Sequence, residues 1–215
     1  MRAKAWMVSV GAALALALTA GALWSQIGAA THTADNGKAL LAALGGPFSL
    51  TDQRGRAVTD RDFHGRVVAL FFGYTFCPDI CPTDLQIVAE ALDRLGPRAD
   101  GVQPLFVTID PQRDTPAQLA EFTTMFSPRI LGLTGTPEQI ADAAKRYRAY
   151  YARAKGGDGD AYTMDHSAFL YLLDRQGKVA EVLPHATPAD RVASALTALL
   201  DQPAAAASPA ASLVR

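Results

Sequence analysis

The sequence predicts an α/β domain with a central mixed sheet flanked by helices, and two observations support this prediction. Two short apolar runs, 67–74 and 102–109, are rich in β-branched and aromatic residues and are typical of strands buried on both faces. A later apolar run, 168–173, is separated from the segment 178–183 (KVAEVL) by a turn that contains Gly177, and this order is typical of a hairpin. Helix-start signals lie between these runs, so the first two strands are expected to be parallel and the hairpin to add antiparallel strands.

Helix starts are marked by four threonines, each followed three residues later by Gln or Asp. A threonine hydroxyl can accept a backbone N–H at a helix start, and the later side chain can bond back to the backbone of the threonine. The pairs are Thr83/Gln86, Thr115/Gln118, Thr136/Gln139 and Thr187/Asp190. The helices predicted from them span 83–95, 116–126, 137–153 and 188–201, with a short strand between the second and third, and a small hairpin is expected to open at 48–50. This order is compatible with a thioredoxin-like sheet, although periodicity alone does not select that fold over other α/β folds.

The two ends of the chain are predicted to lie outside this domain. No Lys, Arg, Asp or Glu occurs from Ala5 to Ala34, and the apolar run 7–24 falls between a bilayer span, about 20 residues, and the shorter core of a cleavable signal. The run is interpreted as an uncleaved anchor, with a processed signal as the alternative; either way the remainder is exported. The predicted parts are 1–30 as transmembrane anchor or signal segment, 31–46 as spacer, 47–201 as the domain, and 202–215 as a disordered Ala/Pro tail.

Composition narrows the classes of function. The 215 residues carry a formal net charge of −1, which argues against nucleic acid as a partner because its phosphates call for a basic face. Two cysteines are too few for a small domain stapled by disulfides. In an exported domain, however, these two cysteines would work in a compartment where a disulfide can form.

The cysteines lie between the end of a predicted strand and the start of a predicted helix. Cys77 and Cys81 are each followed by proline, which disfavours helical geometry in the preceding residue. Cys77 is therefore placed in a loop and Cys81 at the helix entry, with Pro82 as the first helical residue. A helix start favours a thiolate, which is both a nucleophile in disulfide exchange and a ligand for a soft metal. Inert core cysteines and a purely structural disulfide are the alternatives.

A thiolate pair is an incomplete metal site, so further ligands are sought among the four histidines. His166 immediately precedes the predicted strand 168–173, where it could face the cysteine loop across the end of the sheet. His32, His64 and His185 are expected to be solvent-exposed without a role. Spacing alone leaves a ligand role and a structural role for His166 evenly balanced.

Three segments resemble the Sco/SenC/PrrC family of copper-binding assembly factors for cytochrome c oxidase. They are 73–82 (GYTFCPDICP), 107–116 (VTIDPQRDTP) and 165–167 (DHS), in the family's order. The resemblance covers about 47–201. It implies a thioredoxin-like fold, a single membrane anchor, and one copper, Cu(I) or Cu(II), bound by Cys77, Cys81 and His166. It also implies delivery to the dinuclear copper centre of oxidase subunit II, an upstream copper donor protein, and a bacterial inner-membrane location with the domain facing the periplasm.

Two aspartates neighbour these residues. Asp79 and Asp165 are expected either to orient His166 through its other ring nitrogen or to present charge to a partner, and the alternative is local loop hydrogen bonding. Asp110, Arg113 and Asp114 are expected to shape the loop before Thr115 rather than to touch metal.

The sequence favours a metallochaperone, a binding protein without turnover, over an enzyme. The alternative is a thiol–disulfide reductase that acts on the cysteines of the acceptor site, with Cys77 and Cys81 as the redox pair. The spacing weakens this alternative, because three residues rather than two separate the cysteines. A peroxidase is a third reading, but no feature specific to peroxide activation surrounds Cys77.

Overall fold

The computed structural model describes residues 39–154 and 162–203. The chain divides into two compact units, Met1–Ala43 and Leu44–Arg215, and the described residues of the first contain a helical turn at 39–42. The predicted anchor or signal segment 1–30 lies outside the described residues, as does all of the predicted tail beyond residue 203. Within the described part of the chain, no helix has both the length and the apolar character that crossing a bilayer requires.

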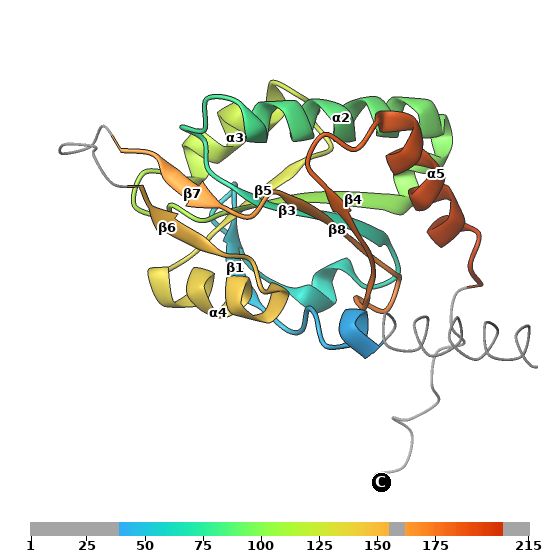
Figure 1. The fold of residues 1–215 in the computed structure, drawn as a ribbon, viewed down its shortest axis with the longest axis horizontal. Coiled ribbons are helices and arrows are strands. Elements are labelled where there is room, and N and C mark those ends of the chain that lie inside the picture. The colour runs from blue at the N-terminus through green and yellow to red at the C-terminus, as the bar shows by residue number, and fades with distance from the viewer. Residues whose placement is uncertain (1–38, 155–161, 204–215) are drawn as a thin grey trace, which may run out of the picture. The chain divides into compact units, whose positions relative to one another are not determined.

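The second unit is built on a seven-stranded sheet with the order β2-β1-β5-β4-β3-β8-β9, and a separate two-stranded ribbon pairs β6 with β7 (Figure 1). The strands are β1 (Ser49–Asp52), β2 (Ala57–Thr59), β3 (Val67–Gly73), β4 (Val102–Thr108), β5 (Leu131–Thr134), β6 (Tyr151–Arg153), β7 (Met164–His166), β8 (Phe169–Leu173) and β9 (Val179–Pro184). The helices are α2 (Ile80–Leu95), α3 (Pro116–Thr124), α4 (Pro137–Tyr147) and α5 (Ala189–Leu200), with short 3-10 turns η1 (Asp60–Phe63) and η2 (Gly96–Gly101).

The sheet is mixed, as the sequence predicts. Strands β3, β4 and β5 run parallel, whereas β8 and β9 add an antiparallel hairpin beside β3. The helices α2, α3 and α5 cover one face of the sheet and α4 covers the other (Figure 1). Every residue of β3 is therefore buried, which explains why its sequence is a continuous apolar run rather than an alternating one. The small N-terminal hairpin is also present as β1 and β2.

Two of the four predicted helix caps are confirmed. The Thr115 hydroxyl accepts the backbone N–H of Gln118, the Thr136 hydroxyl accepts that of Gln139, and both form complete capping boxes. Helix α4 ends at Tyr147 instead of continuing to 153, because Arg148 adopts a left-handed conformation with φ 52° and turns the chain into β6.

The other two caps were predicted wrongly. Thr83 lies inside α2, which already begins at Ile80. The Thr187 hydroxyl donates to the carbonyl of Pro184, and Pro188 occupies the cap position of α5. In both places a nearby turn, rather than the threonine, determines where the helix starts. The β6–β7 ribbon was not predicted, because strands of three residues show almost no periodicity.

Candidate metal centre

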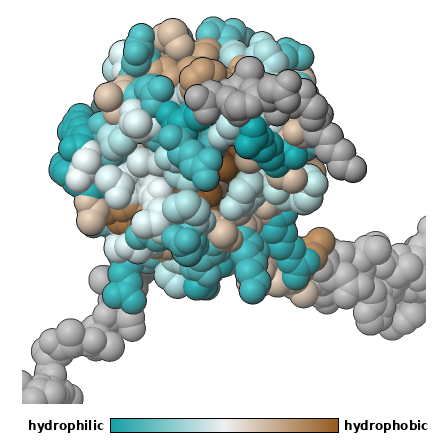
Figure 2. Space-filling model, turned by 90° about the vertical axis from the view of Figure 1, so that its left-hand side faces the viewer, coloured by the Kyte–Doolittle hydropathy of each residue, from teal (hydrophilic) through white to brown (hydrophobic). Residues whose placement is uncertain are grey.

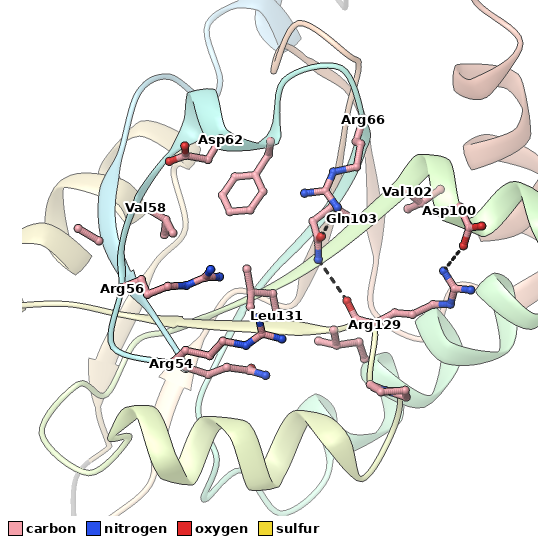
Figure 3. A pocket seen from close by; sticks show the side chains of 15 residues that line it. Arg54, Arg56, Val58, Asp62, Arg66, Asp100, Val102, Gln103, Arg129 and Leu131 are labelled. Atoms are coloured by element: carbon pink, nitrogen blue, oxygen red, sulfur yellow. Dashed lines mark hydrogen bonds and ion pairs between the residues drawn. The ribbon is translucent and has the colours of Figure 1, made fainter.

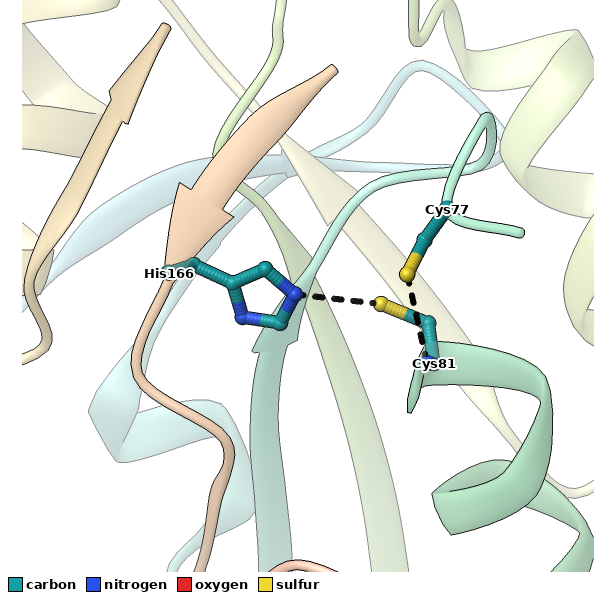
Figure 4. Close-up of side chains that lie close together, drawn as sticks. All are labelled: Cys77, Cys81 and His166. Atoms are coloured by element: carbon teal, nitrogen blue, oxygen red, sulfur yellow. Dashed lines mark hydrogen bonds between the residues drawn. The ribbon is translucent and has the colours of Figure 1, made fainter. Parts of the chain in front are cut away.

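Two neighbouring cysteines and a histidine that is distant in the sequence meet beyond the end of β3 (Figure 4). The Sγ atoms of Cys77 and Cys81 and Nε2 of His166 all lie within 4.8 Å of one another. Cys77 lies in the loop after β3, Cys81 in the first turn of α2, and His166 at the end of β7. The structure thus brings together the three side chains that the sequence singled out.

Cys81 lies inside α2, contrary to the prediction that neither cysteine would be helical. The helix begins at Ile80, so Cys81 is its second residue and Pro82 its third. Proline is tolerated there because the first N–H groups of a helix have no intrahelical partner. The arrangement aims the backbone N–H of Cys81 at Sγ of Cys77, at 3.4 Å. The helix start therefore supplies a donor to the sulfur of the loop cysteine.

The two thiols differ strongly in acidity. A hydrogen bond from the Cys81 thiol lowers the pKa of Cys77 to about 3, although burial opposes the change. Contact with His166 and the backbone N–H groups of Cys81 and Asp79 lower the pKa further. The same hydrogen bond, together with burial and the charge of Cys77, raises the pKa of Cys81. The metal-free pair therefore holds one thiolate at Cys77, and the second proton leaves when a cation replaces it.

The imidazole of His166 is held in one orientation. Nδ1 lies 3.0 Å from the carbonyl oxygen of Ser167, and Nε2 lies 3.6 Å from Sγ of Cys81. The rings of Phe71 and Tyr74 meet the imidazole edge-on, with centroids 6.2 and 5.9 Å away. Burial opposes protonation, but the Cys77 thiolate and the Ser167 carbonyl raise the pKa of His166 overall. A carbonyl at Nδ1 leaves Nε2 as the coordinating nitrogen in the neutral ring.

The two neighbouring aspartates do not orient this ring. The nitrogen that they were expected to contact faces the Ser167 carbonyl instead. Asp165 precedes His166 within β7, and successive side chains of a strand point to opposite faces, so its carboxylate is directed away and exposed. Asp79 is also exposed and contributes through its backbone N–H to Cys77. A contact of either carboxylate with a partner stays a prediction.

The loop that carries Cys77 is tied down by a buried carboxylate. Asp114 accepts hydrogen bonds from the backbone N–H and the hydroxyl of Thr75, at 3.0 and 2.6 Å, and from the hydroxyl of Thr108 at 2.6 Å. Burial raises the pKa of Asp114, although these bonds act in the opposite direction. The sequence assigned Asp114 to its own loop only; the structure shows that it also fixes the segment that leads to Cys77.

A stacked arginine joins the cysteine loop to the segment before β7. The Arg113 guanidinium lies 3.6 Å from the ring centroid of Tyr162 and 4.6 Å from that of Phe76. Its Nη1 donates to the Tyr162 carbonyl at 2.9 Å, and Nε pairs with Asp110 at 2.5 Å. The Tyr162 hydroxyl closes the group by donating to Asp110 at 2.7 Å. Sequence reasoning missed this connection, because nothing local to Arg113 indicates a partner 49 residues away.

The remaining described histidines lie away from the three ligand atoms. His64 is partly exposed and lies 3.7 Å from the Asp60 carboxylate. His185 is also partly exposed, but Nδ1 contacts the nearly buried Asp84 at 3.0 Å. Asp84 lies one helical turn after Cys81, and its negative charge helps to raise the pKa of that thiol. Both histidines are exposed, as expected, but each lies beside a carboxylate, and His185 makes the closer contact.

Cys77 and His166 line a cleft of about 490 Å³, and Cys81 is fully buried behind it. Its walls come from the cysteine loop and the β6–β7 ribbon, and include Tyr74, Pro78, Tyr150 and Met164. Tyr150 is 63% exposed, and Phe76, next to Cys77, is 52% exposed. Figure 2 views the side of the molecule that carries the ribbon and shows a small recessed apolar area among polar side chains near its centre. The sulfurs are therefore shielded, but a partner can approach along one side.

Known proteins match the chain over the domain that carries this cluster. The family model for SCO1/SenC matches residues 36–201. Protein sco1 of Schizosaccharomyces pombe is 44% identical over 156 residues, 71% of this chain and 59% of that protein. Protein SenC of Rhodobacter capsulatus is 49% identical over 133 residues, 62% of this chain and 60% of that protein. The match thus spans about three fifths of each relative's length.

Solved structures agree with the sequence comparison. The structure of Bradyrhizobium japonicum ScoI with copper bound superposes with a TM-score of 0.68 at 43% identity, covering 73% of this chain and 99% of that chain. The superposition supports the mixed-sheet fold, and the family model covers the cysteine loop, the 107–116 segment and the histidine together. The chain therefore belongs to the SCO1/SenC family.

Proposed function

We propose that the chain is a copper metallochaperone, which binds one copper ion through Cys77, Cys81 and His166 and delivers it to the dinuclear copper centre of cytochrome c oxidase subunit II. The observation that carries this proposal is the convergence of the three ligand atoms within 4.8 Å. The copper-bound relative at 43% identity supports the choice of metal.

The donor set suits copper as a cargo. Two sulfurs and one imidazole nitrogen form a soft, low-coordinate set, and thiolate selects Cu(I) while imidazole accepts both copper states. Ligand atoms placed about 2.0–2.3 Å from one ion in a trigonal arrangement lie about 3.5–4 Å apart. The 3.6 Å between Sγ of Cys81 and Nε2 of His166 falls in that range. A structural zinc site would need a fourth protein ligand.

Transfer requires that an acceptor ligand reach the ion before the donor releases it. The cleft beside Cys77 and His166 leaves one side of the cluster open for such an approach. Exposed Phe76 and Tyr150 flank it and offer apolar contact to a protein surface. A cargo site of three ligands with one open side fits delivery better than permanent storage.

The proposal includes the surroundings of the domain. We place residues 1–30 as a membrane anchor or signal segment, 31–46 as a spacer, and 47–201 as the copper-binding domain facing the bacterial periplasm. An upstream protein supplies the copper. The apolar run 7–24 and the preceding Arg2 and Lys4 support this orientation, because a positive flank stays on the cytoplasmic side.

Copper titration of the reduced full chain tests the proposal. The parent should bind one Cu(I) per chain, and His166→Ala should weaken that binding by at least about tenfold, as loss of a ligand does in metal sites. His64→Ala is the matched control, because its imidazole is partly exposed and lies outside the cluster. Failure of the parent to bind stoichiometric Cu(I) would reject the function, and unchanged affinity in His166→Ala would remove that residue from the ligand set.

A second candidate function is reduction of the acceptor's disulfide, and the lowered pKa of Cys77 favours it. The Cys77 thiolate would attack one acceptor sulfur and release the other as a thiolate. Cys81 would then resolve the mixed disulfide, leaving a Cys77–Cys81 disulfide and transferring two electrons to the acceptor. His166→Ala separates the two functions: dithiol exchange with an oxidised subunit II peptide should persist in it, whereas copper transfer should fail.

A further inference from the structure

A second cleft, of about 560 Å³, lies at the other end of the parallel strands (Figure 3). It is lined by the β1–β2 turn, by η1, by Val102 and Gln103 at the start of β4, and by residues 128–131. The cysteine loop follows Gly73, the last residue of β3. Val102, which lines the second cleft, pairs with Val67, the first residue of β3. Seven residues of strand separate the two ends, about 20 Å. The cleft is therefore distinct from the metal centre.

Four arginines line this cleft, at 54, 56, 66 and 129. Arg129 pairs with Asp100 at 2.6 Å and Arg56 with the buried Asp52 at 2.7 Å. Among the described residues, Arg54 and Arg66 have no carboxylate partner. The cleft lining holds these four arginines and two aspartates, Asp62 and Asp100, and the buried Asp52 adds a third carboxylate beneath it. The cleft is therefore positive on a chain whose net charge is −1. Such a local excess of charge favours an anion.

Hydrogen bonds hold the segments and side chains of these arginines in place. The carboxylate of Asp52, which is fully buried, accepts the backbone N–H groups of Arg54 and Arg56 at 2.8 and 2.9 Å and the Arg56 Nε at 2.8 Å. On the opposite wall, the Gln103 amide oxygen accepts Nη1 of Arg66 at 2.6 Å, and its nitrogen donates to the Arg129 carbonyl at 3.1 Å. Figure 3 shows the guanidinium groups of Arg54, Arg56 and Arg66 directed toward the same space.

Gln53, in the β1–β2 turn, offers a further hydrogen-bond donor to the cleft. The amide oxygen of Gln53 accepts the backbone N–H of Gly132 at 2.6 Å and the Thr123 hydroxyl at 3.1 Å. These two bonds fix the orientation of the amide and leave its NH₂ group as a donor in the cleft that Gln53 lines. Donors arranged in advance bind an anion without the cost of ordering them.

We propose that this cleft binds a phosphate group, with Arg54, Arg66 and Gln53 as its principal donors and Arg56 completing the ring. Guanidinium forks match the oxygens of phosphate and carboxylate in pairs. Two guanidinium groups without carboxylate partners among the described residues can each bond to oxygens of one phosphate group, whether it is a monoester or a diester, whereas a carboxylate offers only two oxygens. The phosphate can belong to a free phosphate or monoester, or to the headgroup of an anionic phospholipid.

Calorimetric titration of the metal-free full chain at neutral pH tests this site with two probes. Inorganic phosphate represents the free dianion, and glycerophosphoglycerol represents a phospholipid headgroup as a soluble diester. Saturable binding of phosphate alone identifies a free phosphate or monoester as the ligand, and binding of the diester identifies a headgroup. Binding of neither probe overturns the proposal.

Variants locate the binding. Arg54→Gln/Arg66→Gln should weaken the binding of the bound probe by about tenfold or more, because each charge-assisted bond contributes substantially. Arg54→Gln alone is the second variant, since Arg54 is exposed and its side chain makes no ion pair with a described residue. Arg94→Gln on α2, which pairs with Asp190 outside the cleft, is the matched control. Equal binding by the parent and both cleft variants would refute the site, and neither result depends on copper.

Discussion

Gly73, the last residue of β3, offers a sharp test of how the sulfur of Cys81 is positioned. A Cβ atom at this position would lie 2.6 Å from Sγ of Cys81 and 2.7 Å from the Phe106 ring. Ordinary contact begins at 3.4 Å, so the sulfur would have to move by 0.8 Å. Metal–ligand distances in protein sites are expected to lie within about 0.2 Å of their usual values, so this larger shift of the sulfur would disturb the site. We therefore expect Gly73→Ala to lower Cu(I) affinity by at least about tenfold, which corresponds to about 1.4 kcal/mol.

The same substitution also overpacks the core, which by itself costs about 1–3 kcal/mol of folding free energy. Gly132→Ala in β5 separates the two effects. Its Cβ would lie 2.8 Å from Cβ of Leu119, a similar clash in a buried strand that touches no proposed ligand. Both variants should unfold at lower denaturant concentration than the parent, but Gly132→Ala should keep the parent's affinity for copper.

The measurement is competition for Cu(I) against a chelator, at a temperature where denaturant curves show both variants to be folded. If Gly73→Ala bound copper as tightly as the parent, the absence of a side chain at residue 73 would not be what places the sulfur. If Gly132→Ala lost affinity equally, the loss would reflect general destabilisation instead of ligand displacement.

Three further predictions concern the supports of the site. Tyr74→Phe removes the hydroxyl that accepts the Met164 N–H at 3.2 Å, so it should lower the free energy of unfolding by about 1 kcal/mol and weaken copper binding. Denaturant curves measure the first effect and Cu(I) competition the second. Unchanged copper affinity would contradict a role of this hydroxyl in holding β7. Thr136→Ala removes a confirmed cap and should destabilise the fold by about 1 kcal/mol without changing copper affinity, which the same two assays check. Thiolate absorbance of the reduced metal-free chain should persist on acidification until the pH approaches the Cys77 pKa of about 3, because a thiol ionises above its pKa; loss of this absorbance near pH 9 would contradict the lowered value.

The sequence predicted the features that depend on neighbouring residues. The strands β3 and β8 are continuous apolar runs, β4 and β9 are mostly apolar, and the caps at Thr115 and Thr136 are each completed three residues later. Thr187 failed as a cap because its hydroxyl is engaged by Pro184, a bond that the local pattern does not reveal. Thr83 failed because α2 starts three residues before it.

Features that depend on contacts between residues far apart in the chain could not be predicted from the sequence. His166 was singled out by its position before a strand, but only the resemblance of the chain to a known family connected this residue with the cysteines. The orientation of its ring depends on the Ser167 carbonyl, and that of the loop on Arg113 and Tyr162. The arginines of the second cleft come from segments as far apart as 54 and 129, and no spacing rule connects them.

The ribbon that carries His166 bears on the order in which the three proposed ligands would release copper. Cys77 and Cys81 are four residues apart and are linked by the hydrogen bond from the Cys81 N–H to Sγ of Cys77. Within the described residues, β6 and β7 instead pair only with each other and form no ladder with the seven-stranded sheet. We expect the proposed release of copper to follow this difference. The His166 nitrogen would leave first, at the expense of contacts such as the hydrogen bond from the Met164 N–H to the Tyr74 hydroxyl, and the two sulfurs would release the ion last.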